Sequence, residues 1–175
     1  MASSVSDFTS RVVVAGLNED GRSAVVVDEV AQTRAPTPVV TINDVWQVDA
    51  VPCPVLGDST LSGTLDLVPP KGGVLVRVAA FPPDAEWQDG GGYDEAFSAV
   101  GAEEAAVDGE DAGFHATDTV DVGTVVAGEL HAVLEDGEVL LRPGDTFVQR
   151  GTRHAWSNRG DEPAIVVFTM VSATR

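Results

Sequence analysis

Short runs of β-branched residues, separated by Gly, Pro and Asp, dominate the pattern of apolar and polar positions along the chain. Val and Ile in such runs favour strands, and turn residues at short, regular intervals are typical of a sandwich or a barrel. Segments 11–15 and 23–27 flank the turn residues 18–21 and predict a β-hairpin. Further strands are expected at three apolar runs, 38–48, 73–81 and 164–171.

The stretch 84–113 interrupts this pattern. Within it, residues 93–100 are the best helical candidate, because Phe97 and Val100 fall on one face of a helix. The acidic segment 103–111 is expected to be a loop. A long stretch without a clear strand is typical either of a lid or of a disordered insertion, and the sequence leaves both open.

Length and composition predict one folded domain. The chain has 175 residues, of which 43% are apolar, and both values are ordinary for a globular protein and unlike a disordered one. We expect residues 1–10 to form a flexible N-terminal tail and residues 11–175 to form a single domain.

The charge balance narrows the range of partners. Lys and Arg total 10 against 28 Asp and Glu, which gives a net charge of −18. A surface this acidic repels phosphate backbones and anionic lipids, so we expect no nucleic acid and no membrane partner. An acidic proteome or a salt-adapted host explains the acidity as well as a cationic partner does. The first residues lack the features of a signal peptide, and the single cysteine, Cys53, cannot form an internal disulfide, so a cytoplasmic location is expected.

Candidate chemistry is concentrated between residues 109 and 158, where two of the three histidines lie. On an extended strand, residues two apart share a face. His115, Thr117, Thr119 and Asp121 would therefore point the same way. Taken alone, this alternation fits a solvent-exposed face as well as it fits a site.

Two spaced motifs in this block resemble those of the cupin superfamily. The first cupin motif, G-x5-H-x-H-x3/4-E-x6-G, has its spacing matched by Gly109, His115, Thr117, Asp121 and Gly128. The second, G-x5-P-x-G-x2-H-x3-N, is matched less fully by Gly144, Gly151, His154 and Asn158, because its Pro is absent and it is one residue short. The resemblance covers about 73–172 and implies an all-β fold, a cupin-like jelly-roll β-barrel with an N-terminal β extension and one short helix.

The resemblance also implies a divalent metal ion, held by His115, Asp121 and His154, with Thr117 as a weak additional ligand. Two imidazoles and a carboxylate suit Fe(II), Mn, Ni or Zn. The family's second His is Thr117 here and its Glu is Asp121, whose shorter side chain is expected to weaken the site. The alternative is that the four side chains form a metal-free acid/base or hydrogen-bonded cluster.

Four other residues of the block are candidates for binding a substrate. His131 lies on the strand after Gly128, and Trp156 shares a strand face with His154, although a plain core position is the commoner role for a Trp. Gln149 and Arg150 stand where the family has its Pro turn. Arg150 could bind a carboxylate or phenolate, or form a surface salt bridge.

The run Thr-Asp-Thr-Val-Asp, followed by Val-Gln-Arg-Gly-Thr-Arg-His-Ala-Trp, is similar to a cupin branch of small tailoring proteins near secondary-metabolite or aromatic-compound genes. The resemblance implies a metal-dependent enzyme that acts on a small aromatic or polyketide-like molecule, as an oxygenase or as a dehydratase, cyclase or isomerase. The alternative is a non-catalytic small-molecule-binding cupin with a degenerate metal site. Analogy with cupin relatives suggests a homodimer, and exposed N-terminal strands could pair with another subunit.

Overall fold

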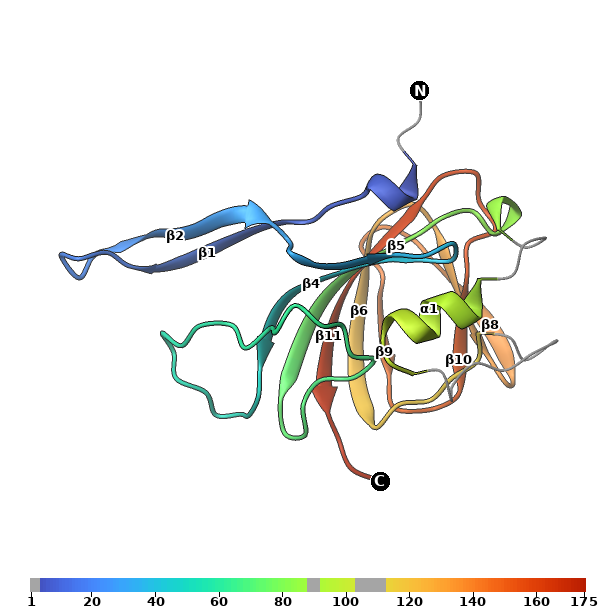
Figure 1. Ribbon diagram of the computed structural model, residues 1–175. Helices are drawn as coiled ribbons and strands as arrows, with labels where there is room; N and C mark the ends of the chain where they lie inside the picture. Colours follow the sequence, from blue (N-terminus) through green and yellow to red (C-terminus); the bar gives the residue numbers. More distant parts are fainter. Residues whose placement is uncertain (1–3, 88–91, 103–112) are drawn as a thin grey trace.

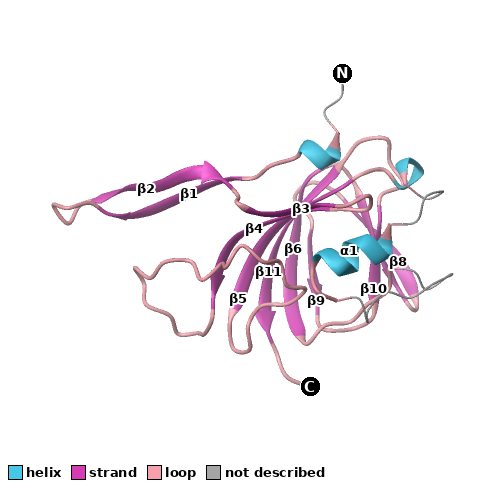
Figure 2. Ribbon diagram, viewed as in Figure 1, coloured by secondary structure: helices cyan, strands magenta, loops and turns pink. Residues whose placement is uncertain are grey.

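The computed structural model describes residues 4–87, 92–102 and 113–175. The fold is mostly β with one short helix, which confirms the predicted fold class (Figures 1 and 2). In chain order the elements are η1 (Val5–Asp7), β1 (Arg11–Leu17), β2 (Ser23–Val30), β3 (Thr33–Pro36), β4 (Thr41–Val48), β5 (Val74–Phe81), η2 (Asp84–Glu86), α1 (Tyr93–Ala99), β6 (Thr119–Ala127), β7 (Leu130–Leu134), β8 (Gly137–Leu141), β9 (Thr146–Gln149), β10 (His154–Ser157) and β11 (Ala164–Ser172).

Three antiparallel sheets organise these strands. The largest has six strands in the order β3-β4-β5-β11-β6-β9, and the second has three in the order β10-β7-β8. β1 and β2 pair only with each other and project from the rest of the molecule as an arm (Figure 1). The arm matches the predicted hairpin, and its turn is held by the Asn18 side chain, which accepts hydrogen bonds from the backbone N–H groups of Asp20 and Arg22.

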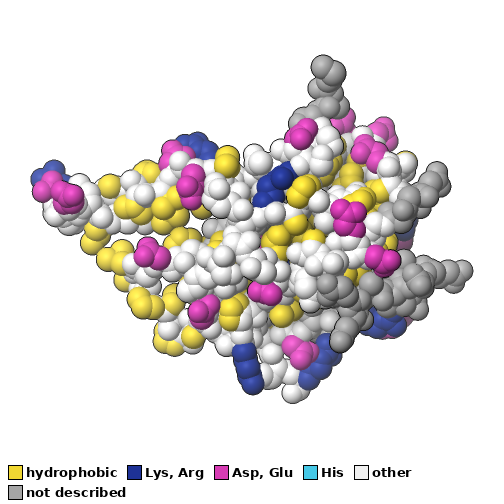
Figure 3. Space-filling view, in the orientation of Figure 1, with side chains coloured by type: hydrophobic (Ala, Val, Ile, Leu, Met, Phe, Trp, Pro, Cys, Tyr) yellow, Lys and Arg dark blue, Asp and Glu magenta, His cyan; other side chains and the backbone are white. Residues whose placement is uncertain are grey.

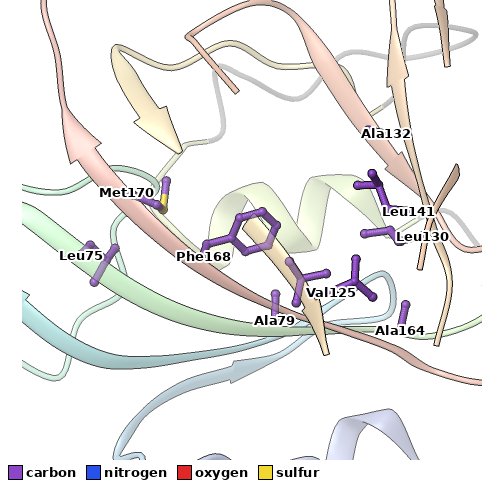
Figure 4. Close-up of a cluster of buried hydrophobic side chains, with 10 residues drawn as sticks. Leu75, Ala79, Val125, Leu130, Ala132, Leu141, Ala164, Phe168 and Met170 are labelled. Atoms are coloured by element: carbon purple, nitrogen blue, oxygen red, sulfur yellow. The ribbon is translucent and has the colours of Figure 1, made fainter. Parts of the chain in front are cut away.

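The hydrophobic core lies between the two larger sheets. β11 buries every second side chain, as the period of two along a strand requires. Its inward residues pack with inward residues of β5 and β6 and, across the interior, with residues of β7 and β8 (Figure 4). The buried members of this core are Leu75, Ala79, Val125, Leu130, Ala132, Leu141, Ala164, Val166, Phe168 and Met170.

Residues 4–10, which fall within the N-terminal tail expected from the sequence, contact the rest of the chain. Residues 4–10 contain η1, and Val5 is buried. The backbone N–H of Ser10 donates to the Asn43 side chain on β4. These contacts tie the segment to the edge of the large sheet, which local sequence alone did not indicate.

α1 forms at Tyr93–Ala99, inside the predicted helix over 93–100. It buries Phe97, and Val100 packs beyond its end against Ile42 and Leu65. Residues 88–91 and 103–112 lie outside the described residues, and with them the acidic segment and Gly109. Among the described residues, no helix is long and apolar enough to cross a membrane.

The motif glycine Gly128 occupies a turn that another residue would strain. Its φ is +67°, and a Cβ there would lie 2.3 Å from the carbonyl oxygen of Pro163. We expect Gly128→Ala to cost more than the roughly 1–2 kcal/mol of a left-handed L-residue, because the clash adds to the strain. Gly137→Ala is the control, since Gly137 also has a positive φ but a Cβ there would meet no atom within 4 Å. Urea unfolding of the two variants measures the difference, and equal losses would contradict the role of the close contact.

Candidate functional site

A cavity of about 140 Å³ lies inside the fold, against the core. Its walls come from the large sheet, from β10 and from the segment that carries η2 and α1. Most of the lining is apolar, and six aromatic side chains contribute to it: Phe81, Trp87, Tyr93, Phe97, Trp156 and Phe168. The polar lining consists of Arg77, Asp84, His115, Asp121, His154 and Asn158.

The two histidines of the predicted site meet through a backbone bridge. The N–H of His115 donates to the carbonyl oxygen of His154, and the N–H of His154 donates to that of His115, each at 3.0 Å. Directly opposed residues of an antiparallel pair project to the same side. The ring centroids are consequently 4.4 Å apart, and both rings line the cavity.

Asp121 reaches the same cavity from β6. Its side chain points inward, is 7% exposed and keeps one carboxylate oxygen, Oδ1, without a hydrogen-bond partner. Thr117 is also buried, but its hydroxyl is 2.7 Å from that of Thr119, and Thr117 does not line the cavity. The structure therefore brings three of the four predicted ligands to one cavity.

Burial keeps the imidazoles neutral. It lowers the pKa of His115, against a hydrogen bond to the Gly113 carbonyl. Burial, and then the nearby His115, lower the pKa of His154 to about 4. Burial raises the pKa of Asp121, although a hydrogen bond from Thr119 and the charge of Arg77 act in the opposite direction. At neutral pH both rings are thus uncharged, the form in which imidazole binds metal ions.

The donor chemistry of the cavity fits a divalent metal ion. Nδ1 of His115 is 3.0 Å from the Gly113 carbonyl oxygen, and Nδ1 of His154 is 3.0 Å from that of Thr152. Backbone carbonyls at Nδ1 are the usual outer partners of metal-binding histidines, and they leave Nε2 for the ion. The unpartnered Oδ1 of Asp121 adds a hard donor. In the described ranges, however, no three His, Cys, Asp or Glu side chains are grouped closely enough to hold an ion, so the histidine pair supplies two ligands of a site that needs more.

Of the four predicted substrate-binding residues, Trp156 lines the cavity, where its ring lies 5.6 Å from that of His154. Gln149 is buried behind His154, with Nε2 2.6 Å from Nδ1, and does not line the cavity. The structure does not bring His131 or Arg150 to the cavity. His131 is on the opposite face of β7 from the core residues Leu130 and Ala132, and Arg150 is exposed beyond the end of β9.

Sequence reasoning missed the charged part of the wall. Arg77 is 5% exposed and Asp44 is 2% exposed, and they form a bidentate pair in which Nε and Nη2 donate to the carboxylate at 2.6 and 3.0 Å. Arg77 Nη2 also donates to the carbonyl of Asp66. The sequence signal for this pair was Arg77 itself, a single charged residue within the apolar run 73–81, because a charge on a buried strand needs a partner.

The segment before α1 supplies further lining residues that the sequence did not single out. Asp84 accepts hydrogen bonds from the Ser157 hydroxyl at 2.6 Å and from the Asn158 N–H at 3.0 Å, which fixes η2 to the end of β10. Trp87 lies edge-on to Tyr93, with ring centroids 5.1 Å apart. Trp87 therefore belongs to the cavity wall.

The sequence is similar to that of known proteins over the part of the chain that carries the histidine pair. The sequence profile described as "Cupin domain" matches residues 103–170. The chain is 50% identical over 46 residues to "Phomopsin biosynthesis cluster protein C'" of Diaporthe leptostromiformis, which covers 26% of this chain and 24% of that protein. It is 44% identical over 52 residues to "Cupin-domain-containing oxidoreductase srdB" of Neurospora crassa, covering 29% of this chain and 26% of that protein. The matched segment thus spans about a quarter of the length of these relatives.

Among solved structures, the Cnp3 cupin domain of Schizosaccharomyces pombe is similar with a TM-score of 0.45 and 10% identity, over 94% of this chain and 83% of that one. KdgF from a Halomonas species is similar with a TM-score of 0.42 and 15% identity, over 77% and 80% of the two chains. The family assignment rests on the sequence match and on the motif residues His115, His154 and Asn158. The chain contains a cupin domain, which the sequence profile matches over residues 103–170.

Proposed function

We propose that this protein is a metal-dependent cupin enzyme that acts on a small aromatic or polyketide-like molecule, as an oxygenase or as a dehydratase, cyclase or isomerase. The observation that carries the proposal is the pair of neutral imidazoles, with ring centroids 4.4 Å apart, in a partly open cavity with aromatic walls. The names of the relatives, which refer to biosynthesis clusters and to oxidoreductases, support the same class of chemistry.

In this proposal His115 and His154 hold the ion, and Asp121, which lines the same cavity, would have to move toward them to add a third ligand. A bound ion would supply Lewis-acid chemistry and, if it is redox-active, a site for O2. The aromatic walls bind the apolar body of the substrate and exclude water from the reacting end. Burial raises the pKa of Asp121, and the charge of Arg77 acts against this and favours the ionised carboxylate that binds an ion.

The size of the cavity limits the substrate portion that it encloses. An apolar cavity of about 150 Å³ in another protein holds one benzene molecule. The present cavity, of about 140 Å³, therefore fits about one aromatic ring without rearrangement. A larger molecule would place one ring beside the histidines and the remainder toward the opening.

Metal analysis of the purified protein tests the proposal. We expect the wild-type chain to retain a stoichiometric amount of Fe, Mn, Ni or Zn, and His115→Ala and His154→Ala to lose it, because each removes one of two close imidazole ligands. His131→Ala is the matched control, since His131 lies away from the cavity, and should keep the metal. Equal metal content in all four proteins would contradict the assignment. Oxygen uptake with candidate phenols then separates an oxygenase from the non-oxidative reactions.

The second candidate is a non-catalytic binding protein. It is favoured by the lack, among the described residues, of a grouped set of three metal-binding side chains, and by Thr at position 117. Trp87 and Trp156 line the cavity, so quenching of tryptophan fluorescence by phenol or catechol reports binding. Unchanged affinity in His115→Ala, in a protein that holds no metal, would favour this candidate over the enzyme.

A further inference from the structure

Asp84 places a buried carboxylate in the wall of the cavity, away from the histidine pair. Asp84 is 8% exposed, and both of its carboxylate oxygens accept hydrogen bonds, Oδ2 from the Ser157 hydroxyl and Oδ1 from the Asn158 N–H. These two bonds leave acceptor positions free, because a carboxylate offers about four. Among the described residues, no Lys, Arg or His side chain forms an ion pair with Asp84. A buried carboxylate in this setting is suited to a cationic ligand.

The nearby Arg159 does not supply that cation. Its Nε donates to the Ser157 hydroxyl at 3.1 Å, so it is connected to Asp84 through that hydroxyl and not directly. Its Nη1 and Nη2 donate to Glu138 at 2.7 and 2.6 Å. Because Glu138 already pairs with Arg159, the charge of Asp84 is left for a group that enters the cavity.

The other charged groups of the lining keep the cavity negative. Arg77 is matched by its bidentate partner Asp44, and burial holds the imidazoles of His115 and His154 in the neutral form. Asp121 adds a second carboxyl group, which is 7% exposed and whose Oδ1 has no hydrogen-bond partner. A cavity with this balance of charge attracts a cation and repels an anion.

Aromatic rings lie beside Asp84 in the same wall. Trp87 follows η2 and stands edge-on to Tyr93, with ring centroids 5.1 Å apart. Burial, and then the charge of Asp84, raise the pKa of Tyr93 to about 12, so the hydroxyl stays neutral and the two side chains are close. Aromatic faces attract ammonium groups, and cages of such rings recognise alkylated amines. The wall therefore combines the two features that bind an organic cation.

We propose that the cavity takes a small aromatic molecule that carries a cationic amine, and that the ammonium group binds Asp84 against the rings of Trp87 and Tyr93. The inference deepens the proposed function by naming the charge of the substrate, and it rests on that function for the reaction at the histidine pair.

The strand β10 separates the amine subsite from the imidazoles. His154 begins the strand and Asn158, which Asp84 binds, follows its end, so their Cα atoms are roughly 13 Å apart along an extended chain. Trp156 lies between them and also lines the cavity. The aromatic ring of the ligand would lie against Trp156, with its reacting end toward the histidines. Because the cavity encloses about one ring, the amine has to be attached by a short chain.

The surface charge favours the same ligand. The net charge is −18, and acidic side chains are spread over the face of the molecule in Figure 3. The field of such a surface raises the local concentration of cations and lowers that of anions. An anionic aromatic molecule, such as a carboxylate, is opposed both by this field and by the charge of the cavity.

Isothermal titration calorimetry with three aromatic probes of similar size tests the proposal. At neutral pH phenethylamine is cationic, phenethyl alcohol is neutral and phenylacetate is anionic. We expect chelator-treated wild-type protein to bind the amine about tenfold more tightly than the alcohol, or better, because a hydrogen bond to a charged group is stronger than a neutral one. Phenylacetate should bind least tightly. Added salt should weaken binding of the amine and leave that of the alcohol unchanged.

Three variants locate the preference. Asp84→Asn should reduce the affinity for the amine to that for the alcohol, because it removes the charge and keeps the shape. Ser157→Ala removes a hydroxyl that bonds to Asp84 but keeps the carboxylate, so the preference for the amine should persist. Asp145→Asn is the charge control, since Asp145 is exposed and accepts a hydrogen bond from the Arg142 N–H, and it should leave both affinities unchanged.

Equal affinity of the wild type for the amine and the alcohol, or no binding of the amine, would overturn the proposal. So would an Asp84→Asn variant that loses both ligands equally, which indicates a structural role, or an Asp145→Asn variant that loses the amine as strongly. If Asp84→Asn does not fold, the three probes and the salt dependence in the wild type decide. All titrations use metal-free protein. Preference for the amine in a chain that retains no metal would therefore support this inference and contradict the enzyme, and metal retention without the preference would do the reverse.

Discussion

Replacement of Arg77 by Leu is expected to lower the free energy of unfolding by about 3–5 kcal/mol, because it leaves a buried carboxylate without its partner. Arg77 and Asp44 are directly opposed across β5 and β4 and are almost completely buried. Their bidentate geometry, with both bonds at 3.0 Å or less, satisfies charges that the interior would otherwise penalise. Removing one partner of such a pair costs far more stability than replacing both partners with apolar residues.

A double variant distinguishes this explanation from simple loss of packing. If the unpaired carboxylate causes the loss, Arg77→Leu combined with Asp44→Leu should recover much of the stability, because no charge remains buried. Arg142→Leu is the control, since Arg142 makes a single side-chain hydrogen bond to Glu129 in an exposed pair and should matter little. Urea unfolding measures all three. A double variant as unstable as the single one would show that the side-chain volume, and not the charge, is what Arg77 contributes.

The strands and the histidine pair were predictable for physical reasons that act locally. Val-rich runs bounded by turn residues identified β1, β2, β5 and β11, because β-branched side chains and turn chemistry leave few alternatives. The approach of His115 to His154 followed from the resemblance of motif spacings, and the structure supplies its cause, which is a reciprocal pair of backbone hydrogen bonds between the two residues.

Thr117 shows where the simple strand rule ceases to apply. We placed His115, Thr117 and Asp121 on one face of a continuous strand. In the structure β6 begins only at Thr119, and His115 is in an isolated bridge with β10. The chain bends between them, so the Thr117 hydroxyl bonds to Thr119 while His115 and Asp121 still reach the cavity.

Contacts that depend on register between distant strands were beyond sequence reasoning. The pairing of β4 with β5 is regular from Thr41 to Asp44 and shifts only beyond Asp44, so the Asp44–Arg77 pair depends on the register of two strands that lie about thirty residues apart. Because β5 carries apolar residues on both faces, its sequence does not tell which of them face the core and which face outward. The aromatic wall likewise depends on how the segment around η2 and α1 folds over the sheet, which no local periodicity encodes.

Acidification is expected to destabilise the metal-free protein by roughly 3 kcal/mol between about pH 6.5 and pH 4, through His154. The pKa of His154 is about 4 in the folded chain, against an ordinary value of 6.5. Between pH 6.5 and about pH 4 the unfolded chain therefore binds a proton at His154 that the folded chain does not bind. The free energy of unfolding falls over this range, until the pH reaches the pKa of His154 in the folded chain. His115, whose pKa is also lowered, adds to the loss. Asp121 opposes it, because its raised pKa makes the folded state take up a proton first.

Urea unfolding of chelator-treated protein at several values between pH 7 and pH 4 measures this slope. His154→Gln removes the titrating ring and should flatten the dependence, even if its stability at pH 7 is lower. His131→Gln is the control, and its slope should match that of the wild type because His131 lies outside the cavity. A steep slope that survives in His154→Gln would assign the acid sensitivity to other groups. A saturating metal ion should steepen the loss, since protons then compete with the ion for the same imidazole nitrogens.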